Sequence, residues 1–399
     1  MQISSLDLFI NLFMNPLNTN SNSKKKLLRA VTVSMSVGFY EPLIEDLQSQ
    51  GYDIVSVSSP GPELDRLRAK NVKVIEVPME RRMAPFKDLQ SLWNLIRVFH
   101  REKPYIVHSM TPKAGMLCML AAWLTRVPRR VHTFTGLVWP IASGLSRRIL
   151  MCTDWLTCAC ATHVIPEGQG VMKDLQAHIT HKPMKVLGYG NVRGVDLVQC
   201  SRRPEVMQLA DTLRKPGFTF LFVGRLVGDK GINELVQAFQ CLHEEFPEAR
   251  LVLVGFHEPE LDPLLPETEK VLQEASYIEF VGPKHGDELL AWYAASDAFV
   301  FPSYREGFPN VVLEAGAMGL PSIVTDINGS REIIEEGKNG TIIPIKSSEA
   351  IYTAMKRMLQ HPEETAAWAA NARPMIASRF ERSFVQQCLY DFYAGFCGI

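Results

Sequence analysis

The sequence predicts an α/β protein with two doubly wound domains that face each other across a cleft. Short apolar segments of strand length alternate with helical segments along most of the chain. The strand segments are apolar almost throughout, which is typical of parallel strands covered by helices on both faces. The length of 399 residues fits two domains of ordinary size.

The first predicted domain covers residues 26–200. Its predicted strands lie at residues 27–33, 52–59, 72–78, 105–110, 129–135 and 185–192, and its predicted helices lie at 40–50, 62–70, 86–102 and 113–124. Strands and helices that alternate in this way build a parallel sheet, with one helix in each crossover. A small-residue loop that contains Gly38 follows the first strand.

The second predicted domain covers residues 201–378 and repeats the pattern. Its predicted strands lie at residues 218–226, 249–255, 277–282, 298–302 and 322–326, and its first predicted helix lies at 232–246. Ligands of such sheets bind outside the carboxyl ends of the strands. A helical tail over residues 379–399 ends the chain, with a crossing back to the first domain as one option.

The first 25 residues are expected to be a flexible or interfacial extension outside the fold. Their apolar segment is too short to span a bilayer, and it lacks the basic leader and cleavage pattern of a signal peptide. A start codon assigned too early is the other explanation. The eight cysteines show no disulfide or zinc spacing, which favours core thiols in a reducing compartment.

Charge is distributed unevenly along a chain whose net charge is −1. Residues 1–200 carry 24 basic and 15 acidic side chains, whereas residues 201–399 carry 18 and 28. Residues 80–150 alone carry 12 basic and 3 acidic side chains. This distribution favours an anionic partner such as a membrane surface or a lipid phosphate, and a solvated basic face is the alternative. A nucleic acid is not expected, because stacking aromatics are not interleaved with the basic residues.

Residues 299–330 contain two glutamates eight positions apart. Glu306 falls in a predicted loop, and Glu314 falls about one turn into a predicted helix whose first turn includes Pro309. The exposed amides near Gly307, Phe308 and Asn310 favour an anion at the start of this helix. Carboxylates beside an anion site fit sugar hydroxyls, which they accept as hydrogen-bond donors. Two ordinary solvated acids are the alternative.

Residues 223–231, with the sequence VGRLVGDKG, follow a predicted strand and carry Arg225 and Lys230. Two cations beside a helix start suit a diphosphate. A P-loop is excluded because the Gly-Lys-Ser/Thr ending is absent, and a dinucleotide cofactor is disfavoured because no GxGxxG follows the first strand. A loop with two surface charges is the alternative.

A second polar group is predicted at strand ends of the first domain. His108 and His132 each lie near the end of a predicted strand, and Thr111 and Lys113 follow His108 at a helix start. A neutral histidine can donate a hydrogen bond to a sugar hydroxyl or a phosphate. A structural role for each histidine is the alternative.

These motifs together resemble family-four glycosyltransferases of the two-Rossmann (GT-B) architecture over about residues 27–390. The Glu-x7-Glu element EGFPNVVLE and the loop VGRLVGDKG carry the resemblance. The segments VPMERRMAPFKDLQSLWNLIRVF, IVHSMTPKAGMLCMLAAWL and FPSYREGFPNVVLEAGAMGLPSIVTDINGSREII are similar to the bacterial PglA-type subgroup. That subgroup extends undecaprenyl-diphosphate-linked glycans with UDP-sugars.

The resemblance implies the following donor-binding roles. Arg225 and Lys230 would hold the donor diphosphate, Glu314 the ribose hydroxyls, and Glu306 the transferred sugar with help from the amides of Phe308 to Asn310. The backbone near Pro283 and Lys284 would read the uracil. His132 would contact the sugar near the reacting face.

In the first domain, the resemblance implies that Gly38 allows a phosphate or acceptor to approach closely. The family's usual Asn-Gly-Val-Asp is Arg193-Gly194-Val195-Asp196 here, so no role of that asparagine carries over.

The predicted activity is therefore a retaining transfer of a hexose or N-acetylhexosamine from a UDP-sugar to a lipid-linked saccharide acceptor. Neither a metal nor another cofactor is expected, since the two cations would neutralise the departing diphosphate. The expected location is the cytoplasm, at the inner face of the plasma membrane. A nucleotide-sugar epimerase of the same fold and a non-catalytic UDP-sugar-binding subunit are the alternatives.

Overall fold

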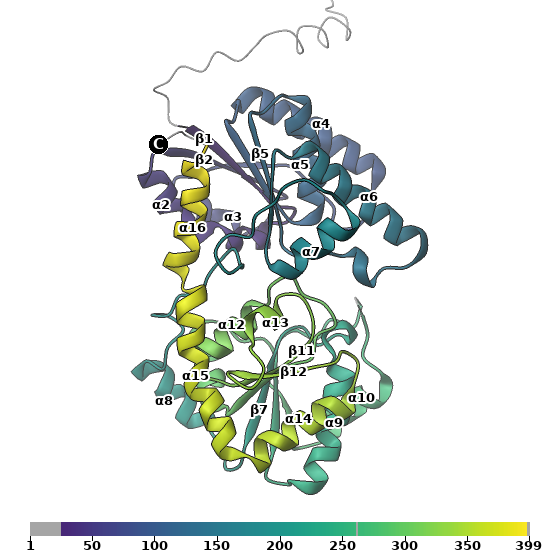
Figure 1. The fold of residues 1–399 in the computed structure, drawn as a ribbon, viewed down its shortest axis with the longest axis vertical. Coiled ribbons are helices and arrows are strands. Elements are labelled where there is room, and N and C mark those ends of the chain that lie inside the picture. The colour runs from purple at the N-terminus through teal and green to yellow at the C-terminus, as the bar shows by residue number, and fades with distance from the viewer. Residues whose placement is uncertain (1–24, 261, 397–399) are drawn as a thin grey trace, which may run out of the picture. The chain divides into compact units, whose positions relative to one another are not determined.

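The computed structural model describes residues 25–260 and 262–396, which form two compact units. The first unit runs up to Ile165 and includes Leu175–Lys185, and the second comprises Pro166–Asp174 and the chain from Val186 onward. The extension expected over residues 1–25 lies outside the described residues, except for Lys25. Each unit contains one six-stranded sheet, which confirms the predicted fold class (Figure 1).

The first sheet has the strand order β3-β2-β1-β4-β5-β6, and all its assigned pairings are parallel. Its strands are β1 (Lys25–Ala30), β2 (Tyr52–Ser58), β3 (Lys73–Glu76), β4 (Ile106–Met110), β5 (Arg129–Phe134) and β6 (His163–Pro166). The order reverses between β1 and β4, so this pair is the topological switch point of the sheet. The loops after β1 and β4 meet there.

Helices cover both faces of the first sheet. They are α2 (Ile44–Ser49), α3 (Leu64–Ala69), α4 (Pro85–Glu102), α5 (Pro112–Leu124) and α6 (Gly144–Cys160), with short 3-10 helices at Ser34–Phe39, Glu41–Leu43 and Trp139–Ile141. Helix α7 (Gln169–His178) follows β6 and is divided between the two units. Right-handed crossovers place α2 and α3 on one face and α4, α5 and α6 on the other. The last three lie side by side, with α5 packed between α4 and α6 (Figure 1).

One predicted strand of the first domain is wrong. Residues 185–192 form an irregular segment, and β6 at His163–Pro166 is the strand that completes the sheet. Gly188, Gly190 and Asn191 have φ values of 55°, 97° and 60°, which lie in the left-handed region and interrupt an extended strand. Strand β6 is only four residues long and follows closely after the apolar end of α6, so its sequence pattern does not stand out as a separate strand.

The second sheet has the order β12-β11-β10-β7-β8-β9 and is also parallel. Its strands are β7 (Thr219–Val223), β8 (Arg250–Val254), β9 (Ile278–Phe280), β10 (Ala298–Phe301), β11 (Ser322–Thr325) and β12 (Gly340–Ile343). The edge strand β12 was not predicted. The switch point lies between β7 and β10, whose aromatic side chains Phe222 and Phe301 stack with ring centroids 5.9 Å apart.

Nine helices belong to the described part of the second unit. They are α8 (Pro204–Leu213), α9 (Ile232–Glu245), α10 (Pro266–Glu274), α11 (Gly286–Ala295), α12 (Asn310–Ala317), α13 (Ser330–Ile333), α14 (Ser348–Gln360), α15 (Pro362–Phe380) and α16 (Arg382–Ala394), with a 3-10 helix at Gly228–Lys230. The apolar core of this unit includes all four residues of β10, each buried. This core fixes the loops that follow β7 and β10.

The boundary between the units lies earlier in the chain than predicted. The structure groups residues 186–200 with the second unit, although the sequence suggested a boundary at residue 200. Val195 donates its N–H to the carbonyl of Phe380, and Arg373 donates to the carbonyls of Leu197 and Cys200. These bonds tie the segment to α15. Helix α16 also groups with the second unit.

The buried carboxylate of Glu102 connects α4 to strands β1 and β3 in the first unit. Glu102, at the end of α4, accepts hydrogen bonds from Lys26 at 3.2 Å, from Lys73 at 2.9 Å and from Arg101 at 3.0 Å. Burial by itself would raise the pKa of Glu102, but these three cations lower it to about 2. Glu102 therefore contributes to stability as long as it is ionised.

Candidate active site

The candidate donor site lies at the switch point of the second sheet. The loop that carries Arg225 follows β7, and the loop that carries Glu306 follows β10. Because β7 and β10 are parallel neighbours, both loops leave the sheet at the same edge. The structure therefore brings together the two motifs that lie about 80 residues apart in the sequence.

Each of the two predicted diphosphate-binding cations is paired with a carboxylate. Arg225 Nη1 lies 3.1 Å from Glu258 Oε2, and both side chains are more than a third exposed. Lys230 Nζ forms a closer ion pair with Glu306 Oε1, in which both side chains are mostly buried. Carboxylates thus occupy the positions next to the cations where a diphosphate would be held. Glu258 was not identified from the sequence, because nothing marks its distant loop as a partner of Arg225.

Backbone geometry fixes the position of Lys230. The residue ends the 3-10 helix Gly228–Lys230, and Gly231 follows with φ of 72°. A Cβ atom on Gly231 would lie 2.2 Å from the carbonyl oxygen of Pro302, so this position requires glycine. The close approach holds the Lys230 loop against the end of β10. The Lys230 ammonium also lies 5.6 Å from the centroid of the Phe301 ring.

The Glu306 loop is anchored on both sides. Ser303 Oγ donates to Glu306 Oε1 at 3.0 Å, and the Phe308 ring packs against Phe380 with ring centroids 5.4 Å apart. Pro309 is the residue that precedes the first turn of α12, one position earlier than the first-turn placement expected from the sequence. Gly307 therefore lies between an anchored glutamate and a buried aromatic ring, and its amide direction is fixed by both.

Glu314 lines a cavity of about 270 Å³ within the second unit. The cavity is lined by Arg193, Gly194, Val195, Asp196, Gln199, Cys200, His285, Gly286, Leu289, Leu290, Asn310, Glu314 and Arg382. Burial raises the pKa of Glu314, while the Arg193 guanidinium and the Tyr293 hydroxyl oppose that shift. Tyr293 Oη donates to Glu314 Oε2 at 3.4 Å. The cavity combines two carboxylates, two amides and two arginines with the apolar side chains of Val195, Leu289 and Leu290, so it offers both polar and apolar contacts to a ligand.

Arg193 is the functional candidate that the sequence analysis did not place. It stands where the family has asparagine, and it faces the same cavity as Glu314 and Asn310. Its guanidinium lies close enough to Glu314 to act on the pKa of that carboxyl. The neighbouring Asn191 donates to Asn310 Oδ1 at 3.1 Å and accepts from the Arg193 N–H at 2.9 Å. The departure from the family motif was the available signal.

The predicted uracil-reading residues Pro283 and Lys284 lie in the loop between β9 and α11. Lys284 lies 3.9 Å from Glu288 and lines a different pocket, next to α8. The next two residues, His285 and Gly286, are the ones that line the Glu314 cavity. The residues of this loop that line the cavity therefore lie two positions after the predicted ones, and a role in reading the uracil stays a prediction.

In the first unit, Thr111 and Gly38 lie in the loops at the switch point. Thr111 Oγ1 lies 2.8 Å from Thr32 Oγ1 and accepts the N–H of Thr32 at 3.1 Å, so the loops after β4 and β1 are joined. Thr111 has φ of 70°, which is strained for a β-branched residue. Gly38 lies in the 3-10 helix Ser34–Phe39, and a Cβ atom there would meet nothing within 4 Å.

The Gly38 position allows a test of close ligand approach. Replacing Gly38 with Ala should leave the melting temperature unchanged or slightly higher, because no protein atom lies near the added methyl group and glycine costs conformational entropy. If a phosphate or acceptor approaches this backbone, transfer should fall several-fold. Transfer at the wild-type rate by a stable Gly38→Ala protein would contradict the predicted role.

The two histidines do not form the paired site that the sequence suggested. In the register of β4 and β5, His108 lies opposite Val131 and His132 lies opposite Ser109, so the two rings point to opposite faces of the sheet. His108 Nε2 lies 2.7 Å from Thr133 Oγ1. His132 Nδ1 lies 2.8 Å from Ser109 Oγ.

Both histidine rings are buried in the core of the first unit, each with 1% of the residue exposed. Burial lowers the pKa of His132 to about 3 and that of His108 well below its usual value, so both rings are neutral. The His132 ring packs directly against Gly115 of α5. The His132 ring is therefore buried in the described structure, and its expected contact with the transferred sugar stays a prediction.

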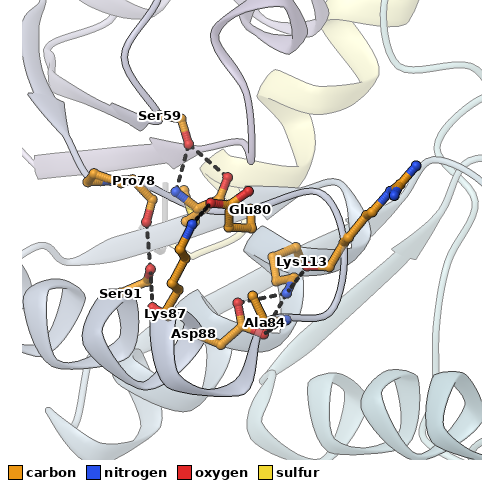
Figure 2. A network of polar contacts seen from close by, with 10 residues as sticks. Ser59, Pro78, Glu80, Ala84, Lys87, Asp88, Ser91 and Lys113 are labelled. Atoms are coloured by element: carbon orange, nitrogen blue, oxygen red, sulfur yellow. Dashed lines mark hydrogen bonds and ion pairs between the residues drawn. The ribbon is translucent and has the colours of Figure 1, made fainter. Parts of the chain in front are cut away.

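Lys113 is also placed differently from its prediction. Its ammonium lies 2.6 Å from Asp88 Oδ2 and donates to the carbonyl of Arg82 at 2.9 Å, as Figure 2 shows. The side chains of Lys113 and Asp88 are only 10% and 15% exposed. The lysine therefore fastens the loop before α4 to the start of α5, and it is not available to a phosphate in this structure.

No group of three or more His, Cys, Asp or Glu side chains within residues 25–260 and 262–396 is arranged to hold a metal ion. Of the cysteines in that part of the chain, Cys118, Cys158 and Cys160 are buried free thiols, and Cys152 and Cys241 are exposed free thiols. Core packing thus accounts for only some of the cysteines.

Comparison with known proteins decides the family. The "Glycosyl transferases group 1" family matches residues 210–375, and the "Glycosyl transferase 4-like domain" family matches residues 40–190. The chain is 30% identical to the capsular polysaccharide biosynthesis glycosyltransferase CapM of Staphylococcus aureus, over 93% of this chain and 97% of CapM. The protein is a group 1 glycosyltransferase. The region matched by the group 1 family contains Arg225, Lys230, Glu306 and Glu314. The region matched by the 4-like family contains His108 to Lys113.

Other relatives agree with this membership in group 1. The UDP-Gal:alpha-D-GlcNAc-diphosphoundecaprenol alpha-1,3-galactosyltransferase of Escherichia coli is 26% identical over 85% of this chain and 89% of its own length. Among solved structures, HepE of Anabaena in complex with UDP and glucose superposes with a TM-score of 0.76 at 18% identity, over 93% of this chain and all of HepE. The latter likeness concerns the fold, and it confirms the GT-B architecture of this group 1 glycosyltransferase.

Proposed function

We propose that this group 1 glycosyltransferase moves a hexose or an N-acetylhexosamine from a UDP-sugar to a lipid-diphosphate-linked saccharide, with retention of the anomeric configuration. The product would serve the assembly of a capsule or another surface glycan. The observation that carries the proposal is the group formed by Arg225, Lys230 and Glu306 at the switch point, next to the Glu314 cavity.

The arrangement supports a nucleoside diphosphate sugar as donor. Arg225 and Lys230 supply two cations at one sheet edge for the diphosphate, and Glu314 supplies a carboxylate within a cavity for the ribose. Glu306 is held beside Lys230, so a sugar that follows the diphosphate would lie within reach of its carboxylate. Uridine as the base is supported by HepE, which binds UDP in its solved structure.

The proposed reaction requires no group beyond donor, acceptor and these side chains. The acceptor oxygen forms a bond to the anomeric carbon on the face from which UDP departs, and the bond from that carbon to the β-phosphate oxygen breaks. The acceptor proton passes to the departing diphosphate. Arg225 and Lys230 stabilise the negative charge that develops on the diphosphate, which is the task a metal ion performs in other transferases.

The acceptor class is supported by the relatives. The Escherichia coli relative is named for a diphosphoundecaprenol-linked acceptor, and CapM is named for capsular polysaccharide biosynthesis. A lipid-linked acceptor lies at a membrane surface, which supports a location at the inner face of the plasma membrane. No helix in the described part of the chain combines the length and apolarity needed to cross a bilayer.

A panel of UDP-sugars tests the donor. The sugar nucleotide that is the substrate should raise the melting temperature most, because it binds the folded state alone. The same nucleotide should then yield a glycosylated lipid when extracted lipid-linked saccharides are added, and analysis of the new linkage by NMR should show the donor's anomeric configuration. An inverted linkage would contradict the retaining mechanism.

The panel also separates the two alternatives. An epimerase would convert a UDP-sugar to its epimer without an acceptor, and a non-catalytic subunit would bind a UDP-sugar without any turnover. The proposal requires turnover that depends on the acceptor. The presence of all four donor-site side chains, Arg225, Lys230, Glu306 and Glu314, favours turnover.

A further inference from the structure

Helix α4 has apolar side chains on two sides. Its inner side packs Leu95, Val98 and Phe99 into the core. Phe86, Leu89 and Trp93, spaced by three and four residues, form an outer apolar stripe, and Phe86 is 92% exposed. A helix of a water-facing surface normally has polar residues on its outer side. The outer side of α4 therefore requires an apolar partner.

The two neighbouring helices extend this apolar surface. Helix α5 has no charged side chain from Ala114 to Leu124, and Trp123 at its end is exposed. On α6, Leu145 is 73% exposed, and Ile149 and Trp155 are exposed as well. Since α4, α5 and α6 cover the same face of the sheet side by side (Figure 1), these residues belong to one surface, the α4–α6 face. Exposed apolar patches of this extent mark interaction sites.

The tryptophans point to the kind of partner. Trp93, Trp123 and Trp155 are each about half exposed, and all three lie on the α4–α6 face. The other three tryptophans, Trp139, Trp292 and Trp368, are buried. Tryptophan is enriched where protein meets the boundary between lipid and water, because its ring is apolar and its N–H is polar.

The charges around the α4–α6 face are almost all positive. Its exposed cations include Arg81, Arg82, Arg97, Arg147 and Arg148. The acids of the same segments are neutralised or buried. Glu80 pairs with Lys87 and Asp88 with Lys113, while Glu102 and Asp154 are buried. Cations that surround apolar side chains complement an anionic lipid surface.

The loop before α4 is held rigidly in position. Figure 2 shows three attachments: Ser59 exchanges hydrogen bonds with the backbone of Met79, Ser91 donates to the carbonyl of Pro78, and Lys113 pairs with Asp88. These bonds fix the ends of the segment that presents Arg81, Arg82 and Met83 to solvent. A segment that is already rigid in the free protein loses little conformational entropy when it binds a surface.

We propose that the α4–α6 face inserts its apolar side chains into the surface of an anionic bilayer, with Phe86, Leu89 and Trp93 as the deepest contacts. The cations at its rim then lie at the level of the lipid phosphates. The proposal deepens, and in part rests on, the proposed use of a lipid-linked acceptor.

Insertion differs from the purely electrostatic contact that the basic sequence suggested. Within that basic stretch, Arg81 and Arg82 are exposed, but Arg129 and Arg130 lie at the start of β5 and are partly buried. Arg130 donates to the carbonyls of Cys160 and Val127. Salt at about 1 M reduces the Debye length to roughly 3 Å and would release an electrostatic contact, whereas inserted apolar side chains remain bound.

Co-sedimentation of the full chain with vesicles tests the proposal. Vesicles of phosphatidylcholine with phosphatidylglycerol should retain the wild-type protein at about 0.15 M and, to a large part, at about 1 M salt. The triple variant Phe86→Ser, Leu89→Ser, Trp93→Ser should bind the same vesicles at least about tenfold more weakly at both salt concentrations. The variant Arg81→Glu, Arg82→Glu should lose binding mainly at the lower concentration.

The matched control is Leu209→Ser, Leu265→Ser, Ile345→Ser, which removes three exposed apolar side chains from the second unit and should bind vesicles like the wild type. The rise in melting temperature caused by UDP should be equal in all proteins, which separates this proposal from the donor assignment. Vesicle binding by the Phe86, Leu89, Trp93 triple variant at wild-type strength, or full release of the wild-type protein by salt, would overturn insertion. A triple variant that changes only oligomeric mass would instead identify the face as a contact between protein chains.

Discussion

Replacing Lys230 with Ala should lower the rate of sugar transfer by about 10²-fold or more, because one of the two cations that stabilise the departing diphosphate is lost. The loss should appear mainly in kcat, since charge on the diphosphate increases as the bond to the sugar breaks. The measurement is the initial rate at saturating UDP-sugar with a fixed acceptor.

The structure supplies the controls for this experiment. Lys230 forms an ion pair with Glu306, so its removal leaves a mostly buried carboxylate without its cation. The melting temperature of Lys230→Ala therefore has to be measured beside its activity. Lys215→Ala removes an exposed lysine whose partner is Glu279, and it should transfer at the wild-type rate. Near-normal turnover by a folded Lys230→Ala protein would remove Lys230 from the diphosphate site.

Replacing Glu102 with Gln should lower the free energy of unfolding of the first unit by roughly 3 kcal/mol at pH 7, as expected for a carboxyl whose pKa falls from 4.5 to about 2 on folding. The folded state holds the charged form more tightly than the unfolded chain does. The contribution is therefore complete above pH 4.5, and it is lost as the pH falls from there toward 2. Urea unfolding of wild type and variant at pH 7 and at about pH 3.5 measures it.

The difference in the free energy of unfolding between wild type and variant should become smaller at acidic pH. Glu76→Gln is the matched control, because its partner Arg68 is exposed and such pairs contribute less than about 1 kcal/mol. A Glu102→Gln protein whose stability deficit is the same at both pH values would show that burial and packing, and not the charge, account for the effect.

Several parts of the site could be predicted because they depend on local pattern. Strand β7 is almost entirely apolar, β1 contains the buried pair Leu27 and Leu28, and each strand is followed by a small-residue or glycine-containing loop, so both the sheets and their binding edges follow from the sequence. Arg225 and Lys230 follow β7, Glu306 lies in the loop after β10 and Glu314 lies within α12; the structure pairs Lys230 with Glu306.

Other parts could not be predicted because they depend on partners far away in the chain. The spacing of Lys113 and Asp88 says nothing about their meeting, since 25 residues and a whole strand separate them. The spacing of Arg225 and Glu258 in the sequence likewise does not indicate that they form an ion pair. His108 and His132 both lie near strand ends, but only the register of β4 and β5 decides that they face opposite sides of the sheet.

The sequence alone therefore determined the two parallel sheets, the loops that carry the chemistry and the family that the chain resembles, because apolar strand segments, the helical segments between them and short glycine-containing loops are patterns of only a few residues. The tertiary structure decided which charged groups are already paired, which histidines are sealed in the core and which helix faces remain uncovered. Pairing and burial depend on the packing of whole elements against one another, and no short stretch of sequence contains that information.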